Sequence, residues 1–245
     1  MSSKSQSERK TFARAVKEAS IRAFKARTGR RSTLEERSYC EITAWDLAMQ
    51  PLDSAVKSVM LTLTFKELIE KSPPEGVGKF QVRFSTKGVH HVDAPIQMQF
   101  LAPNEKVVAT AGFFVQAGKP KELQITNLQG KDGHEALLKD LSRELGENWR
   151  VWAAKRFKRI AESKKMGVVG VLPRYFSTLL GDDVFKWKRR VRQYRQTFRK
   201  AGIERIDSRF IVKPSELSMK LSREARAYRR KEKPKAEKNK RKRLR

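Results

Sequence analysis

The sequence predicts an α+β protein whose two ends are strongly basic. Apolar residues recur at helical spacing in the first seventy residues, alternate with polar residues from Gly78 onward, and become scarce beyond about residue 215. Hydrophobic residues make up 38% of the 245, with thirteen Phe and four Trp, which is enough for a buried core. We therefore expect a basic helical region at 1–74, an α+β core domain at 78–213 and a disordered Lys/Arg-rich tail at 215–245.

Three helices are expected before the core domain. Residues 8–28 form an amphipathic pattern that ends at Gly29. A second helix begins at Ser32, which makes a capping-box pair with Glu35, and ends before Pro51. A third covers about 53–71 and stops at two prolines. Simple helical packing is the expected arrangement, and a helix-turn-helix motif is the alternative.

The core domain is expected to open with an antiparallel β-meander. Alternating patterns around 80–84, 96–100, 107–115 and 123–126 predict about four strands separated by turns. The remaining elements are expected in the order helix, helix, strand, helix, strand. Their predicted ranges are 133–145, 147–164, 168–172, 183–201 and 209–212.

The long helix at 183–201 carries the clearest functional signal. Trp187, Val191, Tyr194 and Phe198 fall on one stripe, which predicts a buried face. No acidic residue occurs between positions 186 and 200, so the cations on the other face lack the Glu partners that a solvated helix normally has. A bound polyanion would relieve their repulsion. The expected contacts are Lys186, Lys188, Arg189, Arg190, Arg192, Arg195, Arg199 and Lys200.

The tail and the overall charge indicate the same kind of partner. Lys and Arg outnumber Asp and Glu by 56 to 27, a formal charge of +29. Nucleic acid, DNA or RNA, is the expected partner, bound largely without sequence specificity. An anionic membrane surface, held by the first helix and the tail, is the alternative. We expect the chain in the cytoplasm or on the nucleoid, or in the nucleus if its source is eukaryotic or viral. The tail contacts would come from Arg229, Arg230, Lys240, Arg241, Lys242 and Arg243.

Several classes of protein are disfavoured. The single cysteine, Cys40, cannot form an intrachain disulfide. No apolar run approaches the ~18–20 residues that span a bilayer. No cluster has the spacing of a zinc site, since His90 and His91 are adjacent on an expected strand and point to opposite faces. We therefore expect neither a transmembrane segment nor a metal.

A glycine-containing segment between the last meander strand and the next helix could bind an anion. Backbone N–H groups of a loop that starts a helix point toward such a ligand. The residues concerned are Gln129, Gly130, Lys131 and Gly133, with Asp132 between them. An ordinary strand-to-helix connection is the alternative interpretation.

Three passages resemble the VirK/YbjX family of bacterial proteins, whose domain is similar to GNAT-type N-acyltransferases. They are LQITNLQG at 123–130, the helix-to-strand passage at 160–171, and RRVRQYRQTFRKAGI at 189–203 followed by FIV. The resemblance covers 78–213 and implies a GNAT-like fold with acyl-CoA as a cofactor. Its pyrophosphate would lie at the 129–133 loop, which is one residue longer than the family pattern. Tyr194 lies on the helix of interest but in the apolar stripe, so no catalytic residue is assigned and enzymatic activity stays open.

Overall fold

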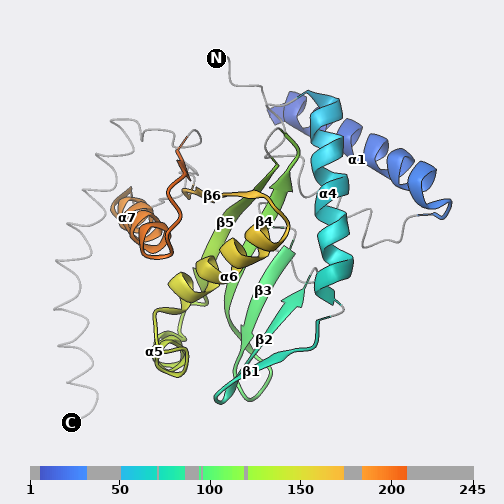
Figure 1. Cartoon of the computed structure of the whole chain (residues 1–245). Coiled ribbons are helices and arrows are strands. Elements are labelled where there is room, and N and C mark those ends of the chain that lie inside the picture. The colour runs from blue at the N-terminus through green and yellow to red at the C-terminus, as the bar shows by residue number, and fades with distance from the viewer. Residues whose placement is uncertain are drawn as a thin grey trace, which may run out of the picture. The chain divides into compact units, whose positions relative to one another are not determined.

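The computed structural model describes residues 6–31, 51–70, 72–85, 94, 96–118, 121–173 and 184–208. Within these residues the chain is α+β, with five helices and one seven-stranded mixed sheet (Figure 1). The helices are α1 (Gln6–Thr28), α4 (Leu52–Glu70), α5 (Glu135–Glu144), α6 (Trp149–Ser163) and α7 (Val184–Lys200). The strands are β1 (Glu75–Val77), β2 (Phe80–Ser85), β3 (Ile96–Leu101), β4 (Val107–Gln116), β5 (Glu122–Gly130), β6 (Gly167–Val171) and β7 (Ile206–Asp207).

The chain divides into two compact units. The first contains residues 1–171 and 196–207, and therefore the whole sheet, and the second contains residues 172–195 and 208–245. Helix α7 is continuous across the boundary, so its last turn belongs to the first unit.

The sheet follows the order of the sequence, from β1 to β7. The first five strands form an antiparallel meander, and β6 and β7 are each parallel to the preceding strand. Helices α5 and α6 connect β5 to β6, as a parallel pair requires. The register of β4 and β5 shifts after Gly112, where Asn127 and then Ile125 are the successive partners, so Thr126 has no partner in β4.

Helices α4 and α6 pack on the same face of the sheet (Figure 1). Phe113 of β4 identifies that face, because its ring lies 6.1 Å from Phe65 of α4 and 5.0 Å from Phe157 of α6. Phe100 of β3 points the same way and meets Trp149 of α6 at 5.6 Å. All these rings except the 6%-exposed Phe65 are at most 1% exposed, so this aromatic layer forms the centre of the core.

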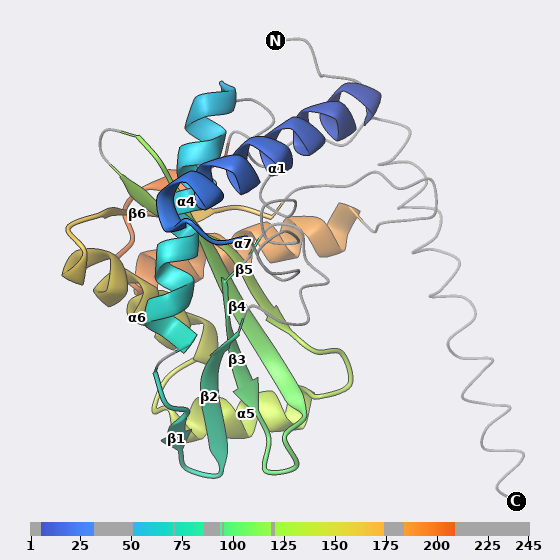
Figure 2. The ribbon, with the colours of Figure 1, turned by 90° about the vertical axis from the view of Figure 1, so that its right-hand side faces the viewer.

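Hydroxyl groups attach α4 to the part of β4 that extends beyond its pairing with β3. The Thr62 hydroxyl accepts the Val115 N–H at 3.0 Å, and the Ser58 hydroxyl accepts the Ala117 N–H at 2.8 Å. The two bonds satisfy a buried backbone donor at Val115 and a partly buried one at Ala117. Helix α1 packs in turn against α4 (Figure 2).

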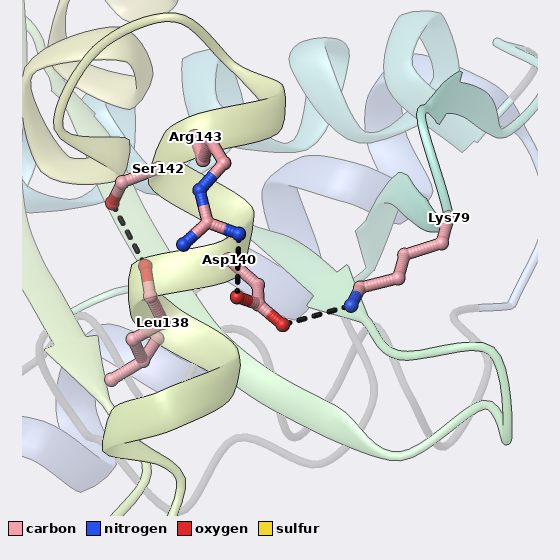
Figure 3. A network of polar contacts seen from close by, with 5 residues as sticks. All are labelled: Lys79, Leu138, Asp140, Ser142 and Arg143. Carbon is pink, nitrogen blue, oxygen red and sulfur yellow. Dashed lines mark hydrogen bonds and ion pairs between the residues drawn. The ribbon is translucent and has the colours of Figure 1, made fainter.

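Charged groups hold α5 to the turn between β1 and β2 (Figure 3). The Asp140 carboxylate accepts the Lys79 ammonium at 2.8 Å and lies 3.3 Å from the Arg143 guanidinium. The hydrogen bond and charge of Lys79 lower the pKa of the Asp140 carboxyl, and Arg143 adds to the effect. Within the same helix the Ser142 hydroxyl donates to the Leu138 carbonyl at 2.8 Å.

The opposite sheet face is polar yet largely buried. Gln97 and Gln99 of β3 are 1% and 6% exposed, and Asn127 of β5 is 7% exposed. The Arg83 Nε donates to the Gln99 Oε1 at 3.1 Å, while the Gln97 Nε2 has no hydrogen-bond partner among the residues that the structure describes. Strand alternation predicts which side chains share a face, but it does not predict that both faces are buried.

The α+β class and most predicted elements are confirmed, with corrections at the strands. The strand predicted at 123–126 continues to Gly130, because Gln129 and Gly130 still pair with β4. Strand β1 was not predicted, and it brings the meander to five strands. The sheet ends with β7 at Ile206–Asp207, and the strand predicted at 209–212 lies outside the described residues. So do the second predicted helix and the tail.

Candidate nucleic-acid interface

Helix α7 presents a dense set of exposed cations. Its seventeen residues include no Asp or Glu. Seven of its eight predicted contact residues have described side chains, and all seven are exposed: Lys188, Arg189, Arg190, Arg192, Arg195, Arg199 and Lys200. The side chains of Lys186 and Trp187 lie outside the described residues, as do the predicted contacts of the tail at positions 229, 230 and 240–243.

The predicted apolar stripe of α7 is buried where it is described. Val191 is 9% exposed, Tyr194 8% and Phe198 0%. Phe198 fits over Gly170 of β6, where a Cβ atom would approach three ring carbons to within 2.7 Å. The absence of a side chain at Gly170 therefore makes the space that Phe198 occupies.

A glycine cap fixes where α7 ends. Gly202 has a φ of +69°, and its N–H donates to the Arg199 carbonyl at 3.0 Å, while the Ile203 N–H donates to the Phe198 carbonyl at 2.9 Å. These two bonds define a Schellman motif. The Lys158 ammonium of α6 also donates to the Gly202 carbonyl at 3.0 Å. The last turn, with Arg199 and Lys200, is thus held by backbone bonds while both side chains stay exposed.

The cations fall into two rows along α7. At ~100° per residue, the first row lies within about 60° of arc and extends over about 16 Å of the helix axis. Its members are Lys188, Arg192, Arg195 and Arg199. The second row is centred about 100° away and has two amides between a cation at each end. Its members are Arg189, Gln193, Gln196 and Lys200.

The cations of α7 differ from those of α6 in their partners. On α6, Lys155 pairs with Glu147 and Arg156 with Glu75, each at 2.7 Å. On α7, none of the seven exposed cations has a carboxylate within 4 Å among the residues that the structure describes. Neighbouring charges four residues apart therefore repel without compensation inside the described protein.

The 129–133 segment, which the sequence presents as a loop, begins inside strand β5. Gln129 and Gly130 belong to β5, and the Lys131 N–H donates to the Val108 carbonyl at 2.9 Å. A Cβ on Gly130 would lie 2.6 Å from the Leu138 Cδ1, so this glycine allows α5 to pack closely on β5. Gly133 has a φ of +80° and is exposed. Much of the segment thus serves the strand-to-helix connection.

Strand β5 continues well beyond its pairing with β6. They pair from Glu122 to Ile125, whereas β5 continues to Gly130 without β6 beside it. The Arg150 guanidinium of α6 donates to the Leu128 carbonyl in this part of β5, at 3.2 Å. The sequence carries no signal for this difference in strand length, because it depends on where β6 ends relative to β5.

Gln193 and Gln196 are candidate site residues that the sequence reasoning missed. Both are exposed on α7 and complete the second row. A count of cations does not include them, although the spacing of four, three and four residues that places them in this row is visible in the sequence.

Comparison of the chain with protein-family models, with curated proteins and with solved structures finds no match. Among the described residues, no helix combines the length and apolar character needed to cross a bilayer. Nor do the described residues contain a group of three or more His, Cys, Asp or Glu side chains arranged to hold a metal ion.

Proposed function

We propose that the protein binds the phosphate backbone of nucleic acid through the exposed face of α7. The observation that carries this proposal is the set of seven exposed cations that have no carboxylate partner in the described part of the chain. Five of the seven are Arg, whose planar guanidinium forms paired hydrogen bonds with phosphate oxygens.

Counterion release supplies the driving force. Each phosphate that a Lys or Arg neutralises frees condensed cations, and binding weakens as salt concentration rises. The same contacts remove the repulsion between neighbouring α7 cations. The net charge of +29 adds a long-range attraction that is independent of nucleotide sequence.

The test compares two double variants with the same change of net charge. Arg192→Gln with Arg195→Gln alters the first row of α7, and Lys155→Gln with Arg156→Gln alters the paired cations of α6. Binding to a labelled 20-base-pair DNA is measured by fluorescence anisotropy at 0.1 M salt. We expect the α7 variant to bind about sixtyfold more weakly, at about 0.9 log unit per lost phosphate contact.

The α6 variant should bind within about threefold of the unmodified protein, since its cations already have partners. Equal losses in the two variants would show that net charge alone matters and would contradict the proposed site. Anionic phospholipid vesicles, added as competitor, test the membrane alternative. Displacement of the DNA by vesicles at equal phosphate concentration would favour the membrane surface as partner.

A second candidate function is acyl-CoA-dependent N-acyl transfer, and the observation that favours it is the part of β5 that continues past its pairing with β6. The resemblance would place the cofactor at the 129–133 segment, which lies at the end of β5 that β6 does not cover, and β5 also carries an irregularity at Thr126. The Lys131 N–H already donates to the Val108 carbonyl, so the segment has one backbone donor fewer for a pyrophosphate, which counts against this candidate.

Thermal unfolding with and without CoA and acetyl-CoA tests the second candidate. A rise in Tm with either compound that Lys131→Glu removes would support it, because the exposed Lys131 side chain would face the phosphates. No shift with either compound at millimolar concentration would leave backbone binding as the single proposed function.

A further inference from the structure

The described surface offers no aromatic platform. Every Phe, Trp and Tyr whose side chain is described is at least partly buried, and Leu52, at 38%, is the one exposed large apolar residue among the described side chains. On α7 itself Tyr194 and Phe198 are turned into the protein, with 8% and 0% exposure. Among its described side chains, the face that carries the cations therefore presents charged and amide groups.

The lack of exposed rings on the described surface favours a duplex over a single strand as the partner. Proteins that bind single strands gain about 1–3 kcal/mol from each base stacked on an aromatic side chain. A surface of guanidinium, ammonium and amide groups instead depends on phosphate density. A duplex presents one charge per about 1.7 Å of its axis, twice the density of one strand.

The two rows of α7 also match the two phosphate backbones that border the major groove of DNA. Six cations lie on the rows, four in the first and two in the second, and the rows are about 100° apart around the helix. The major groove of B-form DNA is about 12 Å wide, admits an α-helix and is bordered by the phosphates of both strands. A helix in this groove brings one row to each strand. Gln196 lies on the side of the second row that faces the first row, so it is the amide nearest the base edges.

We propose that the partner of α7 is double-stranded DNA, with the helix in the major groove and its two rows on opposite strands. This inference rests on the proposed backbone binding and adds the form of the nucleic acid. A-form RNA is a poorer fit because its major groove is deep and too narrow for side chains to read.

The experiment uses the full chain and three probes of one 20-nucleotide sequence: duplex DNA, single-stranded DNA and duplex RNA. If each row cation neutralises one phosphate, the duplex engages six contacts, and a single strand engages the four of the first row. The slope of log K against log salt is then about −5.4 for the duplex and about −2.8 for the single strand. At 0.1 M salt we expect duplex DNA to bind more than about a hundredfold more tightly than the single strand, and more tightly than duplex RNA.

A pair of row variants tests contact with both strands. Arg192→Gln with Arg195→Gln changes the first row, and Arg189→Gln with Lys200→Gln changes the second by the same charge. Each double variant should reduce the slope on duplex DNA by about 1.8. A loss confined to the first row would overturn the two-strand arrangement.

The outcomes separate this inference from the function on which it rests. Salt-sensitive binding in which the single strand or duplex RNA equals duplex DNA would overturn groove docking and leave backbone binding intact. Failure to bind any of the three probes would overturn the proposed function itself.

Discussion

Replacing Gly170 by Ala should loosen the contact that holds the last turn of α7 on the sheet. The new Cβ would lie within 2.7 Å of three carbons of the Phe198 ring, where ordinary contacts need about 3.5–4.0 Å. Phe198 is 0% exposed, so the ring has no solvent into which it can move. Overpacking of this kind costs about 1–3 kcal/mol. For a chain of this size that predicts a fall in Tm of about 2–12 °C.

The matched control lies in the same strand. A Cβ at Gly167 would meet its nearest neighbour, the Glu122 Cγ, at 3.6 Å, which is ordinary contact. Thermal and urea unfolding of Gly167→Ala should therefore differ little from the unmodified protein. Adding Phe198→Leu should reduce the cost of Gly170→Ala, because the smaller side chain makes room. Equal stability of the two glycine variants would refute the assigned packing of α7 on β6.

Three further predictions concern stability away from α7. Thr62→Val removes the hydroxyl that accepts the Val115 N–H, so urea unfolding should show a loss of about 1–3 kcal/mol, and an unchanged midpoint would contradict the docking of α4 on β4. Gln97→Met removes a buried amide nitrogen that has no partner in the described part of the chain and should raise the free energy of unfolding by about 1 kcal/mol, whereas Gln99→Met, which breaks the bond from Arg83, should lower it. The folded-state pKa of Asp140 lies below its unfolded value, so its stabilising effect is present above about pH 4 and is lost as pH falls through the folded pKa. Asp140→Asn should consequently lower Tm at pH 6 more than at pH 2.5, and an equal change at both pH values would contradict the ion pair with Lys79.

The sequence predicted α7 well because its pattern is local. The interval between Val191, Tyr194 and Phe198 defines a buried stripe by helical periodicity alone, and the structure confirms that all three are buried. The cations follow from the same periodicity, since residues not on the stripe must face away from it. Exposure of the seven described cations was therefore foreseeable, while their binding to nucleic acid stays a prediction.

The strand ends were less predictable because tertiary pairing decides them. Gln129 and Gly130 look like a turn, yet pairing with Thr110 and Ala109 keeps both in β5. The burial of Gln97 was equally hidden, because polar residues that alternate with apolar ones normally face solvent. The fit of Phe198 over Gly170 joins two residues far apart in sequence, and no local pattern marks such a pair.

The salt dependence of binding by the two charge-matched variants tests the central claim most directly. Log K is plotted against log salt for duplex DNA with the unmodified chain, with the α7 variant at Arg192 and Arg195, and with the α6 variant at Lys155 and Arg156. Backbone binding by α7 predicts that the slope becomes shallower by about 1.8 in the α7 variant and stays within about 0.3 in the α6 variant. The same slope in all three proteins would contradict the assignment of phosphate contacts to α7.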